Sequence, residues 1–335
     1  MIESVFVTGG TGFLGQSLVR TLRSRGFQVR VLVRPRKGQV DDATVRAMRS
    51  MGIEIIWGDI LDRSILRASV QGATWIFHLA GRLLVPGVAA REYEQLHIEG
   101  TRNLLMACTE VGSLRAIVHG STTGVLGPTG TVVADEGMPL RPSNIYESTK
   151  AAGEQLAFEL ASRHGLPLVV ARPALIYGPG DLHLLNWFRA IQLGHYRVVG
   201  RGDNLFHPIY IDDVVDGLLR CAQTLAAVGR AYHLVGARVL PIREMAEAIA
   251  QALSRSLPRW HIPLPAAMGL AALLKAVPGV PPARLPLTRG RVRFMTESRA
   301  YSGTRARDEL GFVPQVDLET GLQRTVAWYQ SKGLL

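Results

Sequence analysis

The glycine-rich stretch near the start of the chain reads Thr8-Gly9-Gly10-Thr11-Gly12-Phe13-Leu14-Gly15. It follows a strand-like run, Ser4 to Thr8, and opens a segment, 16–25, with apolar residues at helical spacing. Strand, glycine turn and helix together are typical of dinucleotide binding, because the glycines let backbone N–H groups approach a pyrophosphate at the positive end of the helix. The sequence therefore predicts that this loop binds the phosphates of a nucleotide cofactor.

Short β-rich runs alternate with helical patterns on both sides of this loop. The expected strands are Ser4–Thr8, Gln28–Val33, Ile53–Trp57, Thr74–Leu79, Ala116–His119 and Leu168–Ala171, and the expected helices are 16–25, 41–51, 62–70, 91–111 and 144–163. Such alternation indicates βαβ units. The predicted fold class is α/β, with a Rossmann-type doubly wound parallel sheet of at least six strands.

The regular alternation of strands and helices ends after Arg172. It gives way to the connection Tyr177-Gly178-Pro179-Gly180, a helix near 183–193 and a proline-punctuated region, 257–288. This change predicts a smaller, discontinuous C-terminal lobe that binds substrate. We expect the dinucleotide-binding domain to comprise residues 1–175 and about 208–236, and the substrate lobe about 176–207 and 237–335.

Composition limits the class of protein. The chain has 335 residues, of which 47% are hydrophobic and 19% charged, and this excludes intrinsic disorder. Cys108 and Cys221 are far apart in sequence, so neither a disulfide framework nor a thiolate zinc site is indicated, and no metal site is predicted. No signal peptide is recognised. The apolar segment Trp260 to Leu274 is shorter than the ~20 residues of a membrane span. We therefore expect a cytoplasmic location.

The residues after the second expected strand bear on the cofactor. An unphosphorylated ribose usually meets an Asp or Glu about 20 residues beyond the glycines, but here the sequence reads Val33-Arg34-Pro35-Arg36-Lys37. Between Arg20 and Lys37 there are seven basic residues and no acidic one. This pattern favours NADP, with NAD as the alternative, while a solvated basic surface would also explain it.

A tyrosine and a lysine stand four residues apart in Tyr146-Glu147-Ser148-Thr149-Lys150. On a helix they share one face, and Asn144 before Glu147 is typical of an N-cap with a capping-box partner. An ammonium beside a phenol favours its ionised form and eases proton transfer with a substrate oxygen. Only four of the 38 Lys and Arg residues are lysines, so this lysine is unusual for the chain. We expect Tyr146 to act as general acid or base; the plain alternative is a surface helix pair.

Hydroxyl side chains follow the strand Ala116 to His119, in the segment Ser121-Thr122-Thr123-Gly124. Ligands of open α/β sheets bind outside the carboxyl ends of the strands. A hydroxyl here could hydrogen-bond a substrate carbonyl, although turn formation explains Ser and Thr at such a position equally well.

Taken together, these residues resemble the extended short-chain dehydrogenase/reductase superfamily, which contains nucleotide-sugar epimerases and dehydratases, 3β-hydroxysteroid dehydrogenases and dihydroflavonol-reductase-like enzymes. Further matching motifs extend the resemblance over almost the whole chain. They are Gly58-Asp59-Ile60, His78-Leu79-Ala80-Gly81, Gly100-Thr101-Arg102-Asn103, Arg172-Pro173, Tyr177-Gly178-Pro179-Gly180, Pro208-Ile209-Tyr210-Ile211-Asp212-Asp213-Val214 and Leu310-Gly311-Phe312-Val313-Pro314. The pattern departs at His97, where the family often has Asn.

The resemblance implies roles for individual residues. The catalytic residues would be Thr122, Tyr146 and Lys150, with Lys150 also binding the nicotinamide ribose. The cofactor would be bound by Gly9, Thr11, Gly12, Phe13, Leu14, Gly15, Arg34, Asp59, Ile60, Leu79, Ala80, Gly81, Tyr146, Lys150 and Pro173. Asp59 would contact the adenine, Leu79–Gly81 would pass under the cofactor, Pro173 would lie near the nicotinamide, and Arg34 would hold the phosphate of NADP.

The leading hypothesis is an NADP-dependent oxidoreductase that transfers hydride between nicotinamide and a secondary alcohol or ketone, similar to 3β-hydroxysteroid dehydrogenases or dihydroflavonol reductases. The apolar segment Ala266 to Leu274 could line the substrate pocket, although core packing also explains it. Dehydration is disfavoured. The dehydratases that this chain resembles carry an Asp-Glu pair at the position where it has Thr123 and Gly124.

Two alternatives remain. A nucleotide-sugar 4-epimerase with tightly held cofactor would use seven arginines between Arg284 and Arg307, against one acid, Glu297, to bind a diphosphate. A nucleotide-sensing, membrane-peripheral protein would dock its apolar segment on anionic lipid. A small-molecule substrate is expected and no nucleic-acid partner, because no aromatic-basic platform accompanies the arginines. By resemblance, a homodimer through a four-helix interface is expected.

Overall fold

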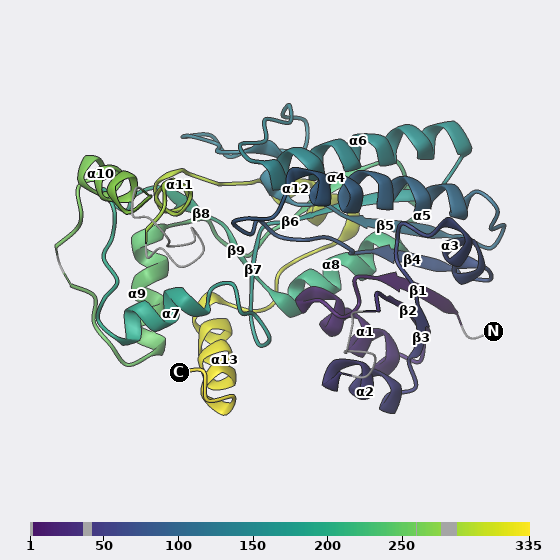
Figure 1. The fold of residues 1–335 in the computed structure, drawn as a ribbon, viewed down its shortest axis with the longest axis horizontal. Coiled ribbons are helices and arrows are strands. Elements are labelled where there is room, and N and C mark those ends of the chain that lie inside the picture. Colours follow the sequence, from purple (N-terminus) through teal and green to yellow (C-terminus); the bar gives the residue numbers. More distant parts are fainter. Residues whose placement is uncertain (1–2, 36–41, 259, 276–286) are drawn as a thin grey trace.

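The computed structural model describes residues 3–35, 42–258, 260–275 and 287–335. A seven-stranded parallel sheet forms its centre, with helices on both faces (Figure 1). Arg36, Lys37 and Arg284, which contributed to the two basic stretches in the sequence, lie outside the described residues. The predicted Rossmann-type α/β fold is confirmed.

The direction of the strand connections reverses at β1, which precedes the glycine loop. The strands of the sheet are β1 (Ser4–Thr8), β2 (Gln28–Val33), β3 (Glu54–Trp57), β4 (Trp75–His78), β5 (Ala116–Gly120), β6 (Leu168–Pro173) and β10 (Ala231–Leu234). Their order is β10-β6-β5-β4-β1-β2-β3, and every neighbouring pair is parallel. The chain runs from β1 to β2 on one side and returns to β4 on the other, so ligands are expected at the carboxyl end of β1.

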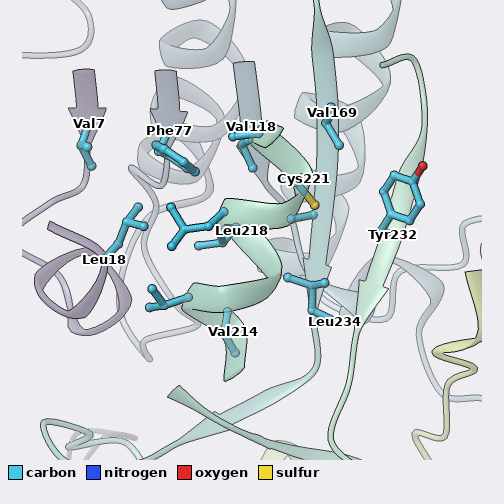
Figure 2. Close-up of a cluster of buried hydrophobic side chains, with 14 of the residues drawn as sticks. Val7, Leu18, Phe77, Val118, Val169, Val214, Leu218, Cys221, Tyr232 and Leu234 are labelled. Carbon is cyan, nitrogen blue, oxygen red and sulfur yellow. The ribbon is translucent and has the colours of Figure 1, made fainter. Parts of the chain in front are cut away.

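The helices divide between the two faces of the sheet. One face is covered by α1 (Phe13–Ser24), α2 (Ala43–Ser50) and α8 (Ile211–Gln223), and the other by α3 (Arg63–Val70), α5 (Gly100–Cys108) and α6 (Ile145–His164). Successive strand residues point to opposite faces. Val5 and Val7 of β1 therefore join the first core, which Figure 2 shows between α1, α8 and the sheet, while Phe6 joins the second.

The long helix expected over 91–111 contains an irregular turn. It begins as α4 (Ala90–Glu94), widens into a π-helical turn, η1 (Gln95–Glu99), and continues as α5. Such turns occur often at functional sites. α6 packs closely against this turn, because a Cβ at Gly153 would lie 2.2 Å from the carbonyl oxygen of His97. Elsewhere among the described residues lie the 3₁₀ helices η2 (Thr123–Leu126) and η3 (Leu225–Ala227).

A third apolar cluster lies apart from the sheet. The remaining elements are β7 (Leu175–Tyr177), α7 (Leu185–Gln192), β8 (Leu205–Phe206), β9 (Pro208–Tyr210), β11 (Leu240–Pro241), α9 (Ile242–Ala252), α10 (Leu264–Lys275), α11 (Arg289–Thr296), α12 (Thr304–Leu310) and α13 (Leu318–Ser331). Phe188, Ile249 and Tyr329 of α7, α9 and α13 pack together in this cluster. In contrast, Ala306 and Leu310 of α12 lie in the core of the sheet. The division into two units remains a prediction, and α12 would belong with the sheet.

Candidate functional site

The glycine loop between β1 and α1 is shaped for close backbone contact. Gly9 has a φ of +75°, and a Cβ on it would lie 2.5 Å from the carbonyl carbon of Leu79. A Cβ on Gly15 would lie 2.1 Å from the carbonyl oxygen of Gly9. Both positions therefore require glycine. The loop continues into the first residues of α1, so the predicted glycines all lie at the carboxyl edge of the sheet.

The N-terminus of α1 has unused backbone donors. Gly12 is its N-cap, no side chain caps it, and its first turn contains no acidic residue. Thr11 and Gly12 are exposed, whereas Phe13 and Leu14 are half-buried. Free N–H groups at the positive end of a twelve-residue helix attract an anion. These residues therefore fit the pyrophosphate of a dinucleotide.

The loop after β4 borders the glycine loop. The N–H of Leu79 donates to the carbonyl of Thr8 over 3.0 Å, and the N–H of Ala80 donates to the Thr8 hydroxyl over 3.3 Å. Gly81, next to Ala80, is exposed. After β3, one oxygen of the Asp59 carboxylate accepts the N–H of Leu61.

Two predicted cofactor residues present little or no side-chain surface. Ile60 is 5% exposed and packs in the core of the sheet, so only its main chain could face a ligand. Pro173 is also buried, and its carbonyl accepts the Thr123 hydroxyl over 3.4 Å. Pro173 ends β6, beside the predicted catalytic segment.

Arg34 lies at the same edge of the sheet, one residue beyond the end of β2. Leu32 pairs with Thr8 in the ladder between β2 and β1, which brings the end of β2 next to the start of the glycine loop. Arg34 is exposed. An exposed guanidinium there is placed to meet a negative group on a dinucleotide bound by the loop.

The tyrosine and lysine lie in the first turns of α6, where the sequence places them. The Asn144 side chain caps this helix by accepting the N–H of Glu147 over 3.0 Å. The capping box is shifted by one residue, because Glu147 accepts the N–H and the hydroxyl of Ser143, over 2.8 and 2.7 Å, instead of the N–H of Asn144. Ser143 offers two donors to one carboxylate oxygen, which makes it the better partner.

The three predicted catalytic side chains converge at the end of β5. The Lys150 ammonium donates to the carbonyl oxygen of Gly120 over 2.5 Å. Thr122, two residues further on, hydrogen-bonds the phenol of Tyr146. Lys150 is buried, whereas Thr122 and Tyr146 are half-buried. The two hydroxyls and the ammonium thus lie together at the carboxyl end of β5.

Burial shifts the pKa of both ionisable groups. It raises the pKa of Tyr146 to about 12, against the opposing effect of the hydrogen bond from Thr122. It lowers the pKa of Lys150 to about 8, against the opposing effect of the Glu154 carboxylate, which favours the ammonium. Tyr146 is thus a proton donor near neutral pH, and Lys150 is charged below pH 8.

Three neutral histidines surround Lys150, and the sequence did not point to them as a group. His78 hydrogen-bonds the hydroxyls of Thr8 and Thr101 over 2.8 and 2.9 Å. The ring of His119 lies 5.1 Å from that of His78. Burial, and to a smaller extent the charge of Lys150, lower the pKa of His78 to about 3. The only prior signal was the position of His78 and His119 at the ends of two adjacent strands.

His97, in the π-helical turn, links this turn to α6. Its Nε2 accepts the N–H of Arg82 over 3.1 Å, so its proton is on Nδ1, which donates to the Thr149 hydroxyl over 2.8 Å. Its ring lies 5.8 Å from that of Tyr146. His97 therefore holds the turn and the catalytic helix together as a neutral side chain.

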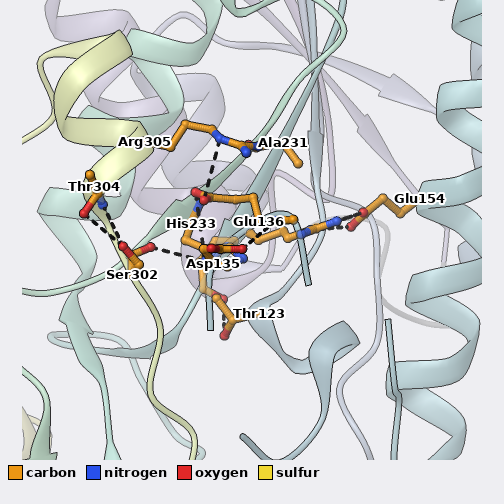
Figure 3. A network of polar contacts seen from close by, with 12 residues as sticks. Thr123, Asp135, Glu136, Glu154, Ala231, His233, Ser302, Thr304 and Arg305 are labelled. Atoms are coloured by element: carbon orange, nitrogen blue, oxygen red, sulfur yellow. Dashed lines mark hydrogen bonds and ion pairs between the residues drawn. The ribbon is translucent and has the colours of Figure 1, made fainter. Parts of the chain in front are cut away.

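A buried ion pair stabilises the chain at the end of β5. Arg172, at the end of β6, forms a bidentate pair with Glu154, one turn beyond Lys150 on α6. Figure 3 shows Glu154 at one end of this polar network. Glu154 also accepts the hydroxyl of Ser121 over 2.5 Å. Gly120 and Ser121 are thus both hydrogen-bonded to side chains of α6. These contacts fix the position of Thr122, the next residue.

A segment near the C-terminus reaches the same region. Arg299 pairs with Glu147 over 2.9 Å. Its N–H donates to the carbonyl of Leu205, and the next residue, Ala300, accepts the N–H of Ala134. The start of the catalytic helix is therefore connected to chain more than 150 residues away, which no local pattern predicts.

An apolar loop borders the site after β4. Leu83, Leu84 and Val85 are 43%, 51% and 43% exposed. The Tyr93 hydroxyl accepts the N–H of Val85 over 2.8 Å and holds this loop to α4. The loop begins two residues after Gly81, so apolar surface lies close to the predicted cofactor position.

The arrangement of loop, hydroxyls and ammonium agrees with a comparison with known protein families. Residues 5–235 match the model of the NAD-dependent epimerase/dehydratase family. The chain belongs to this family. Membership confirms the predicted place in the extended short-chain dehydrogenase/reductase superfamily and the prediction of a nicotinamide-dependent enzyme of that type.

The proteins similar to this chain include a dehydrogenase, a reductase and an epimerase. The chain is 30% identical over 348 residues to 3beta-hydroxysteroid-dehydrogenase/decarboxylase isoform 2 of Arabidopsis thaliana, covering 96% of this chain but only 61% of that protein. It is 32% identical to 2-alkyl-3-oxoalkanoate reductase of Stenotrophomonas maltophilia (strain K279a), covering 96% and 98% of the two chains. A solved structure of UDP-glucuronic acid 4-epimerase from Bacillus cereus in complex with NAD has a TM-score of 0.75 at 21% identity, over 98% and 99% of the chains, and supports the fold alone.

Among the described residues, no helix has both the length and the apolar character needed to cross a membrane. Within the same residues, no three His, Cys, Asp or Glu side chains are grouped as a metal site would require.

The close backbone contacts of the glycine loop give a first prediction. Gly15→Ala forces a Cβ against the backbone of Gly9 and Gly10, so we expect it to weaken dinucleotide binding by at least about tenfold. The measurement is a fluorescence titration with NADPH and NADH. Gly112→Ala is the matched control, since a Cβ there meets no atom within 4 Å, and it should bind as the unaltered chain does. Equal affinity in both variants would contradict the role of the loop.

Proposed function

We propose that this protein is an NADP-preferring oxidoreductase that reduces a ketone on an apolar substrate, or oxidises the corresponding secondary alcohol. The observation that carries the proposal is the convergence of Thr122, Tyr146 and Lys150 at the end of β5, beside the open glycine loop. A bound nicotinamide would supply or accept the hydride. The glycine loop, Asp59 and Leu79–Gly81 are the residues that would hold the dinucleotide that carries this nicotinamide.

In the reductive direction the hydroxyls of Thr122 and Tyr146 hydrogen-bond the carbonyl oxygen of the substrate. Tyr146 donates its proton to this oxygen as negative charge develops on it. The Lys150 ammonium stabilises the phenolate that remains, and Gly120 holds the ammonium in place. The oxidative direction reverses these steps, with Tyr146 as the base.

The pKa of Lys150 limits the reductive direction at high pH. The ammonium is present below pH 8 and is lost as the pH rises through about 8, whereas Tyr146 keeps its proton because its pKa is about 12. We expect the rate of ketone reduction at saturating cofactor to fall above a midpoint near pH 8. Glu154→Gln removes a charge that favours the ammonium, so the midpoint should move to lower pH. A rate constant that does not change between pH 7 and pH 10 would contradict this assignment.

The substrate class is inferred from the loop after β4. Leu83, Leu84 and Val85 present apolar side chains next to Gly81, where a flexible alkyl chain or a ring system would be removed from water. Two relatives support this choice by name, one a 3-oxoalkanoate reductase and one a hydroxysteroid dehydrogenase. We infer a carbonyl compound with extended apolar groups rather than a sugar.

Arg34 is proposed to select NADP. A 2′-phosphate at the end of β2 would gain a charge-assisted hydrogen bond from the exposed guanidinium. We expect Arg34→Ala to weaken NADPH binding by about tenfold or more and to leave NADH binding within about twofold, because charge-assisted hydrogen bonds contribute about 1.5–3 kcal/mol. The measurement is a paired fluorescence titration, with the exposed Arg67, on α3, changed to Ala as control. If the affinity for NADPH and the affinity for NADH fell equally, Arg34 would not recognise the 2′-phosphate.

A nucleotide-sugar 4-epimerase remains the second candidate. Its support is the exposed arginines of α11, Arg289, Arg291 and Arg293, which could meet a diphosphate. Cofactor exchange separates the two: an epimerase keeps its nicotinamide through purification and turns over with none added, whereas the proposed reductase consumes added NADPH in proportion to product.

We also propose a homodimer in the cytoplasm. The outer surfaces of the helix that contains η1 and of α6 form a groove of about 610 Å³, bordered by Gln95, Ile98, Ile145 and Ser148. Half-buried Ile98 and Ile145 offer apolar contacts there to the same helices of a second copy. The two cysteines, Cys108 and Cys221, are free and buried, as in a reducing compartment.

A further inference from the structure

Several leucines of α10 lie on the side that faces solvent. Ala267 and Ala271 are fully buried and pack with Val292 of α11. In contrast, Leu270 and Leu273 are 46% and 70% exposed. Helices on the surface of globular proteins show the opposite arrangement, with large apolar residues inside and polar ones outside. The packing of α10 on the protein therefore does not explain these two leucines.

The exposed side of α10 is apolar throughout. Ala266, Leu270 and Leu273 follow one another at helical spacing on this side, and no Lys, Arg, Asp or Glu occurs from Trp260 to Leu274. Trp260, which precedes the helix, is 60% exposed. We call the side chains of Trp260, Leu264, Leu270 and Leu273 the α10 surface. Contiguous exposed apolar residues of this kind mark a contact with another molecule or with a membrane.

Arginines of the described residues lie beside the α10 surface. Arg289, Arg291 and Arg293 are exposed on α11, which packs on α10. The Arg197 guanidinium lies 4.5 Å from the ring centre of Trp260. The partner of this surface must therefore combine an apolar interior with negative charge at its boundary.

We propose that α10 and α11 dock the protein on the surface of an anionic lipid bilayer. The leucines and Trp260 would enter the boundary between headgroups and acyl chains, while the arginines of α11 contact the headgroups. A second copy of the chain fits less well, because a symmetric contact would bring the arginines of α11 toward their own counterparts. Figure 1 shows α10 and α11 at the end of the molecule opposite the N-terminus, so docking would leave the glycine loop free.

Co-sedimentation of the full-length chain with vesicles tests this proposal. The vesicles are phosphatidylcholine alone, or phosphatidylcholine mixed with phosphatidylglycerol, each at low and high salt. We expect binding to the mixed vesicles only, weakened by high salt. The double variant Leu270→Ser/Leu273→Ser should lower the partition coefficient by about tenfold or more. Leu225→Ser is the matched control, since Leu225 in η3 is as exposed as Leu273, at 70%, and it should bind normally.

A second variant separates charge from apolar contact. Arg289→Gln/Arg293→Gln should also weaken binding to the mixed vesicles by about tenfold, because each basic residue near an anionic surface contributes to attraction. Equal binding to both kinds of vesicle, or no binding to either, would overturn the proposal. It would also be overturned if Leu270→Ser/Leu273→Ser converted a dimer to a monomer in vesicle-free solution, because a second copy would then cover this surface.

Discussion

Tyr146→Phe is expected to lower the turnover number by about 10²- to 10⁴-fold, the usual contribution of a positioned general acid or base. The substitution removes one hydroxyl and keeps the ring, which lies against His97 with 5.8 Å between ring centres. Cofactor binding and thermal stability should therefore change little. The measurement is the steady-state rate with NADPH and an apolar ketone, together with an NADPH titration of the same variant.

Tyr196→Phe is a suitable control for this prediction. Tyr196 is a buried tyrosine that packs against Trp187, away from the hydroxyl of Thr122. We expect its variant to keep the turnover number of the unaltered enzyme. If Tyr146→Phe retained more than about half of the original rate, another group would have to supply the proton, and the proposed chemistry would be wrong.

Glu154→Ala has the largest expected effect on stability. It leaves the guanidinium of Arg172 buried without its carboxylate, and breaking a buried ion pair in this way costs about 3–5 kcal/mol. The side chains of Arg172 and Glu154 are 6% and 2% exposed, so water cannot replace the lost partner. Chemical denaturation should show this loss in the free energy of unfolding. The end of β5 should also become less ordered, because Ser121 loses its partner.

Two comparisons make the Glu154 prediction specific. Glu159, on the same helix, pairs with Arg163 at the surface over 2.8 Å, so Glu159→Ala should cost less than about 1 kcal/mol. The double variant Glu154→Leu/Arg172→Met replaces the pair by apolar side chains and should recover most of the stability. If Glu154→Ala were as mild as Glu159→Ala, the buried pair would not support the site as we describe.

Local sequence patterns predicted the parts of the site that depend on nearby residues. The glycine loop, the Asn144 cap and the spacing of Tyr146 and Lys150 are each determined within about one or two helical turns. The parallel sheet and its carboxyl edge follow from the βαβ alternation, whereas the strand order comes from the structure. These features place Thr122 and Lys150 at one edge of the sheet, where the structure has them.

The features that sequence reasoning missed all depend on distant partners. The π-helical turn at Gln95–Glu99 was read as regular helix; in the structure this turn packs closely against Gly153 of α6, a contact between distant residues. The Glu154–Arg172 pair left a weak signal, namely charged residues among apolar ones on α6 and β6. The ion pair between Arg299 and Glu147 left no signal in the sequence, because 152 positions separate the two residues along the chain.

Transfer of deuterium from labelled cofactor tests the central claim most directly. NADPH deuterated at the transferable position of the nicotinamide is incubated with the protein and a panel of apolar ketones, and the products are examined by mass spectrometry and NMR. The account predicts one deuterium on the carbinol carbon for each NADPH consumed, and almost none when Tyr146→Phe replaces the unaltered protein. Isomerised sugar nucleotide without net consumption of NADPH, or product without deuterium on the carbinol carbon, would contradict it.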